Sequence, residues 1–265
     1  MINRALFARE MKVSIKPLVI ISAVIALYVT VIISMYDPET IASLDRFIEN
    51  MPEIMAAVGM SSGADSLLGF MVSYLYGFIL LLFPMIFSIL RGNGLIAKYV
   101  DSGSMAVLAA SPVRRRTIAL TQALALVFGI FLLTAFTTLL EFAVARIYFP
   151  GELELTALLR LNTGLLCLHL CVGGICFLCS CVFSDTRRSI AFGGGIPLLM
   201  YVLRMLANVG GPAEKAGYFS LFTLFDPDGL AAGNAGGIGA AVLLATAVLL
   251  FISGILVFER KDLHI

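Results

Sequence analysis

The chain has 265 residues, of which 60% are hydrophobic and 13% charged, and its mean hydropathy is +1.01. Soluble globular domains carry about 25% charged residues, so this composition excludes a soluble domain. The formal net charge is only +1. Because no basic domain stands free of the apolar segments, we expect no nucleic-acid partner.

Six long apolar stretches fill most of the chain. A helix of about 20 residues crosses a hydrocarbon core of about 30 Å, and each stretch is long enough to do so. The stretches are residues 17–36, 67–90, 118–142, 161–183, 190–209 and 238–258. No connection between them exceeds about thirty residues, which is too short for a soluble domain. We predict an all-α, polytopic membrane protein with six transmembrane helices, forming one transmembrane domain over residues 1–265.

The basic residues fall mainly on one side of these stretches. Thirteen of the 18 Lys and Arg lie on the side that holds both termini. They are Arg4, Arg9, Lys12, Lys16, Arg91, Lys98, Arg114, Arg115, Arg116, Arg187, Arg188, Arg260 and Lys261. Because cytoplasmic loops retain basic residues, we predict that the N- and C-termini are both cytoplasmic.

The N-terminal tail is patterned like a surface helix. Its basic residues Arg9, Lys12 and Lys16 share one arc of a helical wheel, and the apolar residues Phe7, Met11 and Ile15 share the opposite arc. This pattern predicts an N-terminal interfacial helix that contacts membrane lipids, followed at Pro17 by the first span. A simple positively charged tail is the alternative. The first apolar run is longer than the 7–15 residues of a signal-peptide core, so we expect it to be retained.

The first outer connection also has a helical period. Apolar residues recur every three or four positions from Ile41 to Val58, with Asp45, Glu49 and Glu53 between them. The pattern predicts one or two amphipathic helices on the outer surface, interrupted near Pro52.

The connection from Arg91 to Thr117 is polar but contains a short apolar stretch. Gly103 and Pro112 bracket about two helical turns that include Met105, Val107 and Leu108. We expect these apolar side chains to be exposed at the cytoplasmic side, where they would require a partner surface. The run Arg114–Arg116 is also compatible with simple anchoring at anionic headgroups.

The same segment carries a family resemblance. The sequence from Asp101 to Arg114 resembles the acidic-x-Gly-Thr/Ser … Leu … Ser/Thr-Pro-Val-x-Arg signature of ABC-type-2 exporter permeases. Residues 47–59 and the closing residues 258–263 are similar to the outer loop and the end of that family. The chain departs from the family pattern at Asp101, Ala106 and Gln122, where Glu, Glu and Lys are common.

The resemblance implies a half-transporter in the plasma membrane that works as a homodimer. Each copy binds a cytoplasmic ABC ATPase subunit, which holds ATP and Mg²⁺ and hydrolyses the nucleotide. The chain itself is then a bacterial transport subunit with no catalytic residue, no cofactor and no metal. The coupling residues are Asp101, Gly103, Ser104, Leu108, Pro112 and Arg114. In agreement, the chain contains no G-x-x-x-x-G-K-[ST] phosphate loop.

The fourth stretch concentrates all five cysteines and one histidine. Cys167, Cys171, Cys176, Cys179 and Cys181 surround His169. A metal or thiol-relay site is one interpretation. Close helix packing by small, polarisable side chains is the other, and it is favoured because cysteines along one helix cannot surround a metal.

Ionisable residues inside the apolar stretches are candidates for a substrate pathway. Tyr201, Arg204 and Asn208 share one helix face, and Glu141 lies near the outer end of the third span. Both charged residues could instead reach the outer interface by extending their side chains. The resemblance implies export of a hydrophobic or amphipathic substrate. Because the short connections leave no large external domain, a peptide is preferred over a drug or lipid. The alternatives are an ion-coupled secondary transporter, or an intramembrane thiol or metal enzyme.

Overall fold

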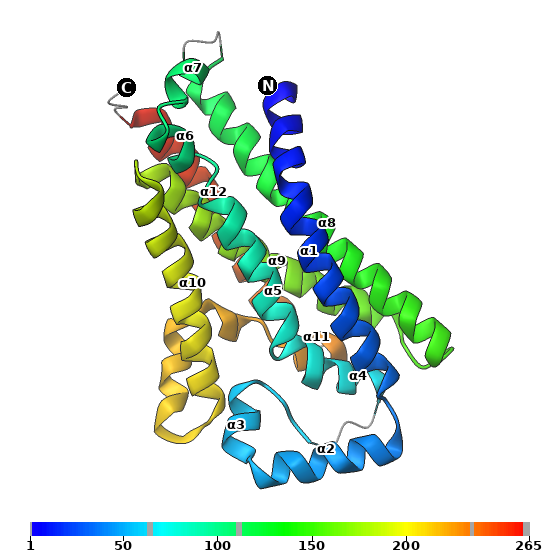
Figure 1. The fold of residues 1–265 in the computed structure, drawn as a ribbon. Coiled ribbons are helices and arrows are strands. Elements are labelled where there is room, and N and C mark those ends of the chain that lie inside the picture. Colours follow the sequence, from blue (N-terminus) through cyan, green and yellow to red (C-terminus); the bar gives the residue numbers. More distant parts are fainter. Residues whose placement is uncertain (1, 63–65, 110–112, 234–235, 262–265) are drawn as a thin grey trace.

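The structure is a computed structural model that describes residues 2–62, 66–109, 113–233 and 236–261 (Figure 1). Every regular element in this part of the chain is helical. The elements are α1 (Arg4–Ser34), α2 (Pro38–Asn50), α3 (Pro52–Ala57), α4 (Leu67–Met71), the π-helix η1 (Val72–Tyr76), α5 (Ile79–Gly92), α6 (Ala97–Asp101), α7 (Met105–Ala109), α8 (Arg115–Tyr148), α9 (Leu155–Val182), α10 (Thr186–Asn208), the 3₁₀ helices η2 (Gly211–Phe219) and η3 (Leu221–Leu224), α11 (Pro227–Ala232) and α12 (Gly236–Arg260).

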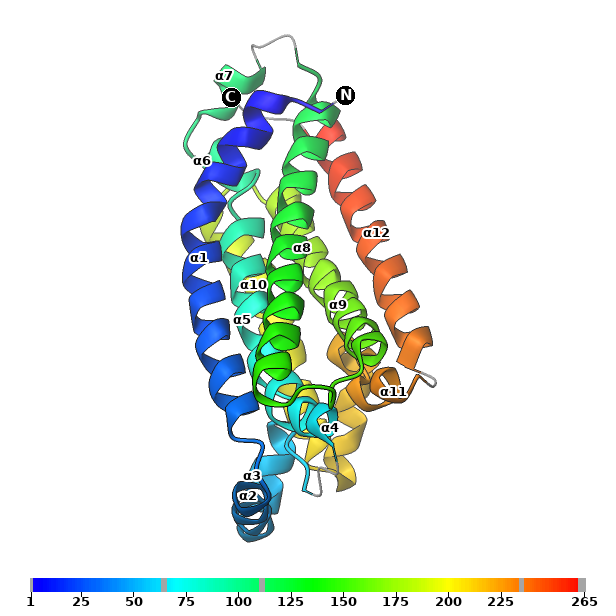
Figure 2. The same ribbon diagram turned by 90° about the vertical axis from the view of Figure 1, so that its right-hand side faces the viewer.

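Within the described residues, six helical segments are long and apolar enough to cross a membrane, which confirms the all-α, six-span prediction. They are α1, residues 79–101, α8, α9, α10 and α12. Both termini lie at one end of the bundle with α6 and α7, while α2, α3 and α11 lie at the other end (Figures 1 and 2). We call these the inner and outer ends, following the distribution of basic residues.

Helix α9 forms the centre of the bundle. In the most apolar 18-residue stretch of α9, 72% of the residues are buried, whereas 22% are buried in the corresponding stretches of α1 and α12. It packs against α5, α8, α10 and α12. Small residues allow this close approach: a Cβ atom added to Gly174 would lie 3.0 Å from Cβ of Leu250 on α12.

Helix α9 also satisfies backbone carbonyls that prolines leave without a donor. A proline at position i cannot donate to the carbonyl at i−4. Pro84 thereby frees the Leu80 carbonyl, which lies 2.8 Å from Nε2 of His169. Pro197 frees the Gly193 carbonyl, to which the Cys176 thiol donates at 3.0 Å. Two polar side chains of α9 therefore complete the hydrogen bonding of α5 and α10.

The N-terminal tail differs from the predicted interfacial helix. Residues 4–34 form one continuous helix that passes through Pro17 without a break. The tail is held along α8, where the rings of Phe7 and Phe128 lie 6.0 Å apart and the Asn3 N–H donates to Thr121 Oγ1. Met11 is half-buried, and Arg9 and Lys12 are exposed. Pro17 removes only one hydrogen bond of the helix. The contacts with α8 offset this loss and keep the tail in line with the span.

The second predicted span is interrupted. The stretch from residue 67 divides into α4, η1 and α5, with a break at Gly77 and Phe78. Gly77 packs directly on the outer loop, since a Cβ atom there would lie 2.7 Å from the Val58 carbonyl oxygen and 2.9 Å from that of Gly59. This backbone contact brings the outer loop against the break.

The outer loop confirms the predicted amphipathic helices. Helices α2 and α3 are separated at Met51, immediately before Pro52. Helix α2 lies across the end of the bundle, nearly perpendicular to the spans (Figures 1 and 2). Its Ile48 is buried against Phe70 and Tyr74, so the apolar face of α2 closes the outer end of the second span.

Candidate functional site

The predicted coupling segment forms two short helices at the inner end. Helices α6 and α7 are joined by a turn in which Gly103 has φ +70°, a conformation that glycine adopts without strain. A Cβ atom on Gly103 would meet nothing within 4 Å, so the turn faces open space. The hydroxyls of Ser102 and Ser104 lie 2.6 Å apart, and Asp101 accepts a hydrogen bond from the Thr186 N–H at the start of α10.

The expectation of an exposed apolar face on this segment is wrong for the side chains that can be placed. Met105 is 1% exposed, and Leu108 is half-buried against the core of its own chain. The segment folds back over the bundle, so Met105 and Leu108 pack against the core of their own chain. Asp101, Gly103, Ala106 and Arg114 remain exposed. Pro112 and the side chain of Val107 lie outside the described residues.

A buried polar network lies directly beneath this segment. Glu10 on α1 and Arg91 on α5 form an ion pair at 2.7 Å, with side chains only 4% and 11% exposed. Arg91 also donates to Ser14 at 2.8 Å, and Glu10 accepts from the hydroxyl of Tyr99 on α6. The side-chain amide of Gln122 on α8 donates to the same carboxylate at 3.4 Å. The network therefore ties α1, α5, α6 and α8 together at the inner end.

Sequence analysis missed this network. Arg91 was counted only as one of the inner-side cations, and Glu10 was not singled out. The available signal was that Glu10 is the single carboxylate among the first 36 residues, within a basic segment. A buried carboxylate in a span requires a partner, but nothing local identifies Arg91 as that partner.

The outer end contains a polar pocket of about 410 Å³ between α10, η1 and the loops. Arg204 and Asn208 line it, as predicted, but Tyr201 does not. Tyr201 is buried beside Phe222, with ring centroids 5.5 Å apart. Arg204 is 8% exposed and its guanidinium lies 5.9 Å from the Phe225 ring centre. Among the described residues, Nη1 of Arg204 has no hydrogen-bond partner.

Two carboxylates in this pocket were not predicted. Asp226 and Asp228 line it with Arg204, together with the hydroxyl-bearing Ser61 and Ser73. Asp226 is the N-cap of α11 and accepts from the Gly229 N–H at 3.0 Å. Burial, and then the neighbouring Asp226 carboxylate, raise the pKa of Asp228 above its ordinary value. The only sequence signal was an Asp-Pro-Asp run in an outer connection.

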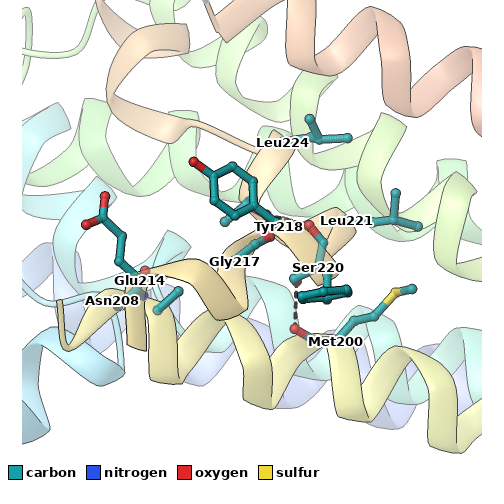
Figure 3. A pocket seen from close by; sticks show the side chains of 11 residues that line it. Met200, Asn208, Glu214, Gly217, Tyr218, Ser220, Leu221 and Leu224 are labelled. Carbon is teal, nitrogen blue, oxygen red and sulfur yellow. Dashed lines mark hydrogen bonds between the residues drawn. The ribbon is translucent and has the colours of Figure 1, made fainter. Parts of the chain in front are cut away.

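An apolar cleft of about 690 Å³ adjoins the polar pocket (Figure 3). It lies between α10 and the 3₁₀ helices η2 and η3, and its walls include Met200, Tyr218 and Leu221. Ser220 closes its base by donating to the Met200 carbonyl at 2.6 Å. Asn208 and Thr223 line both cavities. A polar pocket and an apolar cleft therefore share a wall at the outer end.

Glu141 lies apart from this pocket. It is fully buried, and it accepts hydrogen bonds from the Tyr76 hydroxyl at 2.9 Å and from Nδ2 of Asn162 at 2.8 Å. It does not line the polar pocket, so the structure does not bring it together with Arg204. Its hydrogen bonds instead join η1, α8 and α9.

The five cysteines are buried, free thiols within the α9 packing surface. In the part of the chain that the structure describes, no group of three or more His, Cys, Asp or Glu side chains is arranged to hold a metal ion. Cys176 and His169 instead contact backbone carbonyls, as described above. The arrangement supports the packing interpretation of this helix.

No protein-family model matches the sequence, and no curated protein matches it either.

Proposed function

We propose that this chain is the transmembrane subunit of an ABC-type-2 exporter in a bacterial plasma membrane. A second copy pairs with it, and a cytoplasmic ATPase subunit binds ATP and Mg²⁺ and supplies the energy. The resemblance of the Asp101–Arg114 segment to the permease signature supports this proposal. The six apolar helices and the shared end of both termini are compatible with it.

The observation that carries the proposal is the exposed turn at the inner end. Helices α6 and α7 present Asp101, Gly103 and Ala106 to the outside while burying Met105. A small, mostly polar projection in which Met105 is buried and Leu108 is half-buried is suited to reversible docking of a soluble subunit. The network of Glu10 and Arg91 beneath the turn connects α6 to α1 and α5, so a displacement of α6 on docking would be transmitted to both helices.

The two adjoining outer cavities favour an amphipathic substrate. The polar pocket is lined by Asp226, Asp228 and Arg204, whose Nη1 has no hydrogen-bond partner within the described part of the chain. The cleft next to it is lined mostly by apolar side chains such as Met200 and Leu221, with Glu214 among its polar residues. A molecule with a charged group and an apolar surface, such as an amphipathic peptide, would fill both cavities.

Replacing Ala106 with arginine should abolish binding of the ATPase subunit. Ala106 is exposed on α7, so the larger side chain blocks docking without disturbing the core. The tagged chain would be purified from membranes of the organism that encodes it, and copurifying ATP hydrolysis would be measured. Ala232→Arg, at an exposed alanine of α11 on the outer end, is the matched control. Absence of ATPase from the unmodified protein, or its retention by Ala106→Arg, contradicts the proposal.

Replacing Arg204 with methionine should weaken the response to substrate without affecting assembly. Loss of one charge-assisted hydrogen bond should raise the half-stimulating concentration of an amphipathic peptide about 10-fold or more. Peptide-stimulated ATP hydrolysis by the purified complex measures this effect. Arg146→Met is the control, because Arg146 is an exposed outer-end arginine that does not line the pocket. An unchanged response would remove Arg204 from the pathway.

An ion-coupled secondary transporter is the second candidate function. The break in the second span at Gly77 and Phe78 favours it, because discontinuous helices form the ion sites of many such transporters. Transport by the purified chain in vesicles, driven by a proton or sodium gradient without ATP, would support this alternative.

A further inference from the structure

A small cavity at the inner end lies beside the buried network. It has a volume of about 170 Å³ and opens between α1 and the α5–α6 connection. Its walls are Arg9, Glu10, Val13, Arg91, Gly94, Lys98, Tyr99, Ser102 and Ser104. Nine residues from three helices, the α5–α6 connection and the turn at residues 102–104 therefore surround a space of the size of one small polar group.

The cavity is positively charged. Three cations, from Arg9, Arg91 and Lys98, face one carboxylate, from Glu10. Glu10 is already paired with Arg91 at 2.7 Å. Among the described residues, neither Arg9 nor Lys98 has a carboxylate within ion-pair distance. Two cations are therefore left without a counter-charge, and the cavity favours an anion over a cation.

The donors around the cavity are held in place. The Arg9 guanidinium lies over the Tyr99 ring, 5.3 Å from its centre, and the Tyr99 hydroxyl is fixed by its hydrogen bond to Glu10. The paired hydroxyls of Ser102 and Ser104 also line the cavity and add neutral donors. Such a ring of donors suits the several oxygens of a phosphate group better than the two oxygens of a carboxylate.

The apolar surroundings indicate that the phosphate belongs to a lipid. Val13 lines the cavity and is 48% exposed, and the exposed Ile20, about two turns further along the same face of α1, continues the apolar surface toward the membrane centre. A phosphate in the cavity would therefore have an acyl-compatible surface directly beside it. Basic pockets at the cytoplasmic ends of membrane helices bind anionic headgroups in this manner.

We propose that this cavity is a binding site for the headgroup phosphate of an anionic phospholipid, held by Arg9 and Lys98. The bound lipid bridges α1 and α6, and so braces the turn at residues 102–104 against the first span. The inference does not depend on the proposed export function, because it concerns only lipid binding at the inner end.

Lipid binding by the purified protein tests this site. The protein in detergent would be titrated with phosphatidylglycerol and separately with phosphatidylcholine, and bound lipid counted by native mass spectrometry. The variant Arg9→Gln/Lys98→Gln should lower the affinity for phosphatidylglycerol about 10-fold or more. Phosphatidylcholine, whose choline cation offsets the charge of its phosphate, should bind more weakly than phosphatidylglycerol to the unmodified protein. An unchanged melting temperature in the absence of lipid shows that the variant is folded.

The control variant Arg187→Gln/Arg188→Gln removes the same charge from the inner end, at exposed residues that do not line the cavity. It should bind phosphatidylglycerol as the unmodified protein does. Equal losses in both variants, or no loss in the first, would overturn the site. A further experiment replaces the lipid with inorganic phosphate. If millimolar phosphate raises the melting temperature of the protein as much as phosphatidylglycerol does, the cavity binds free phosphate and the lipid assignment is rejected.

Discussion

Replacing Arg91 with leucine should lower the free energy of unfolding by about 3–5 kcal/mol, because it leaves a buried carboxylate without its cation. Glu10 is 3% exposed, and Arg91 is its ion-pair partner at 2.7 Å. The hydrogen bonds from Tyr99 and Gln122 remain, but neither group carries a compensating positive charge. The melting temperature of the purified protein and its yield from membranes measure the effect.

Two further variants separate the buried charge from the loss of a side chain. Glu10→Leu/Arg91→Leu removes both charges and should be more stable than Arg91→Leu alone, since no unpaired ion remains. Arg188→Leu disrupts the exposed pair with Asp185 at 3.6 Å and should change stability by at most about 1 kcal/mol. If Arg91→Leu lowered the free energy of unfolding no more than Arg188→Leu does, the pair of Glu10 and Arg91 would not stabilise the fold.

Replacing His169 with leucine should lower the free energy of unfolding by about 1–3 kcal/mol, the usual cost of leaving a buried hydrogen-bonding group unsatisfied. Nε2 of His169 donates a hydrogen bond to the Leu80 carbonyl. Pro84 has no N–H with which to make the usual helical hydrogen bond to this carbonyl. Since the Leu80 oxygen is an acceptor, His169 must carry its proton on Nε2. Thermal unfolding of the purified variant measures the loss.

A double-mutant cycle tests the cause of this loss. Pro84→Ala restores a backbone N–H that can donate to the Leu80 carbonyl within α5. His169→Leu should then lower the free energy of unfolding much less in the Pro84→Ala background than in the unmodified protein. Equal losses in the two backgrounds would show that His169 stabilises the bundle by packing rather than by serving this carbonyl.

Features that depend on neighbouring residues were predictable. The outer helices α2 and α3 followed from apolar residues spaced three or four apart and from Pro52, both of which act within a few residues. The continuous helix through Pro17 was not predicted, because the contacts that hold it, such as Phe7 with Phe128, come from α8. A proline permits a break, and tertiary contacts decide whether one forms.

The candidate sites show the same division. Arg204 and Asn208 were predicted to face one cavity because helical spacing alone places them together. Asp226 and Asp228 are brought to that cavity by a loop. A loop has no regular residue spacing from which the positions of its side chains could be predicted. Met105 was expected to be exposed because its own segment offers nothing to cover it, yet the fold brings α6 and α7 back over the bundle.

The sequence by itself determined that the protein is helical, that it has six membrane-spanning segments, and that basic residues gather at the end holding the termini. These properties depend on the length of apolar runs and on the order of charges along the chain. Only the tertiary structure decided which polar groups meet. Glu10 pairs with Arg91 across 81 positions and His169 serves Leu80 across 89, because helix packing brings distant residues together and burial requires each polar group to find a partner.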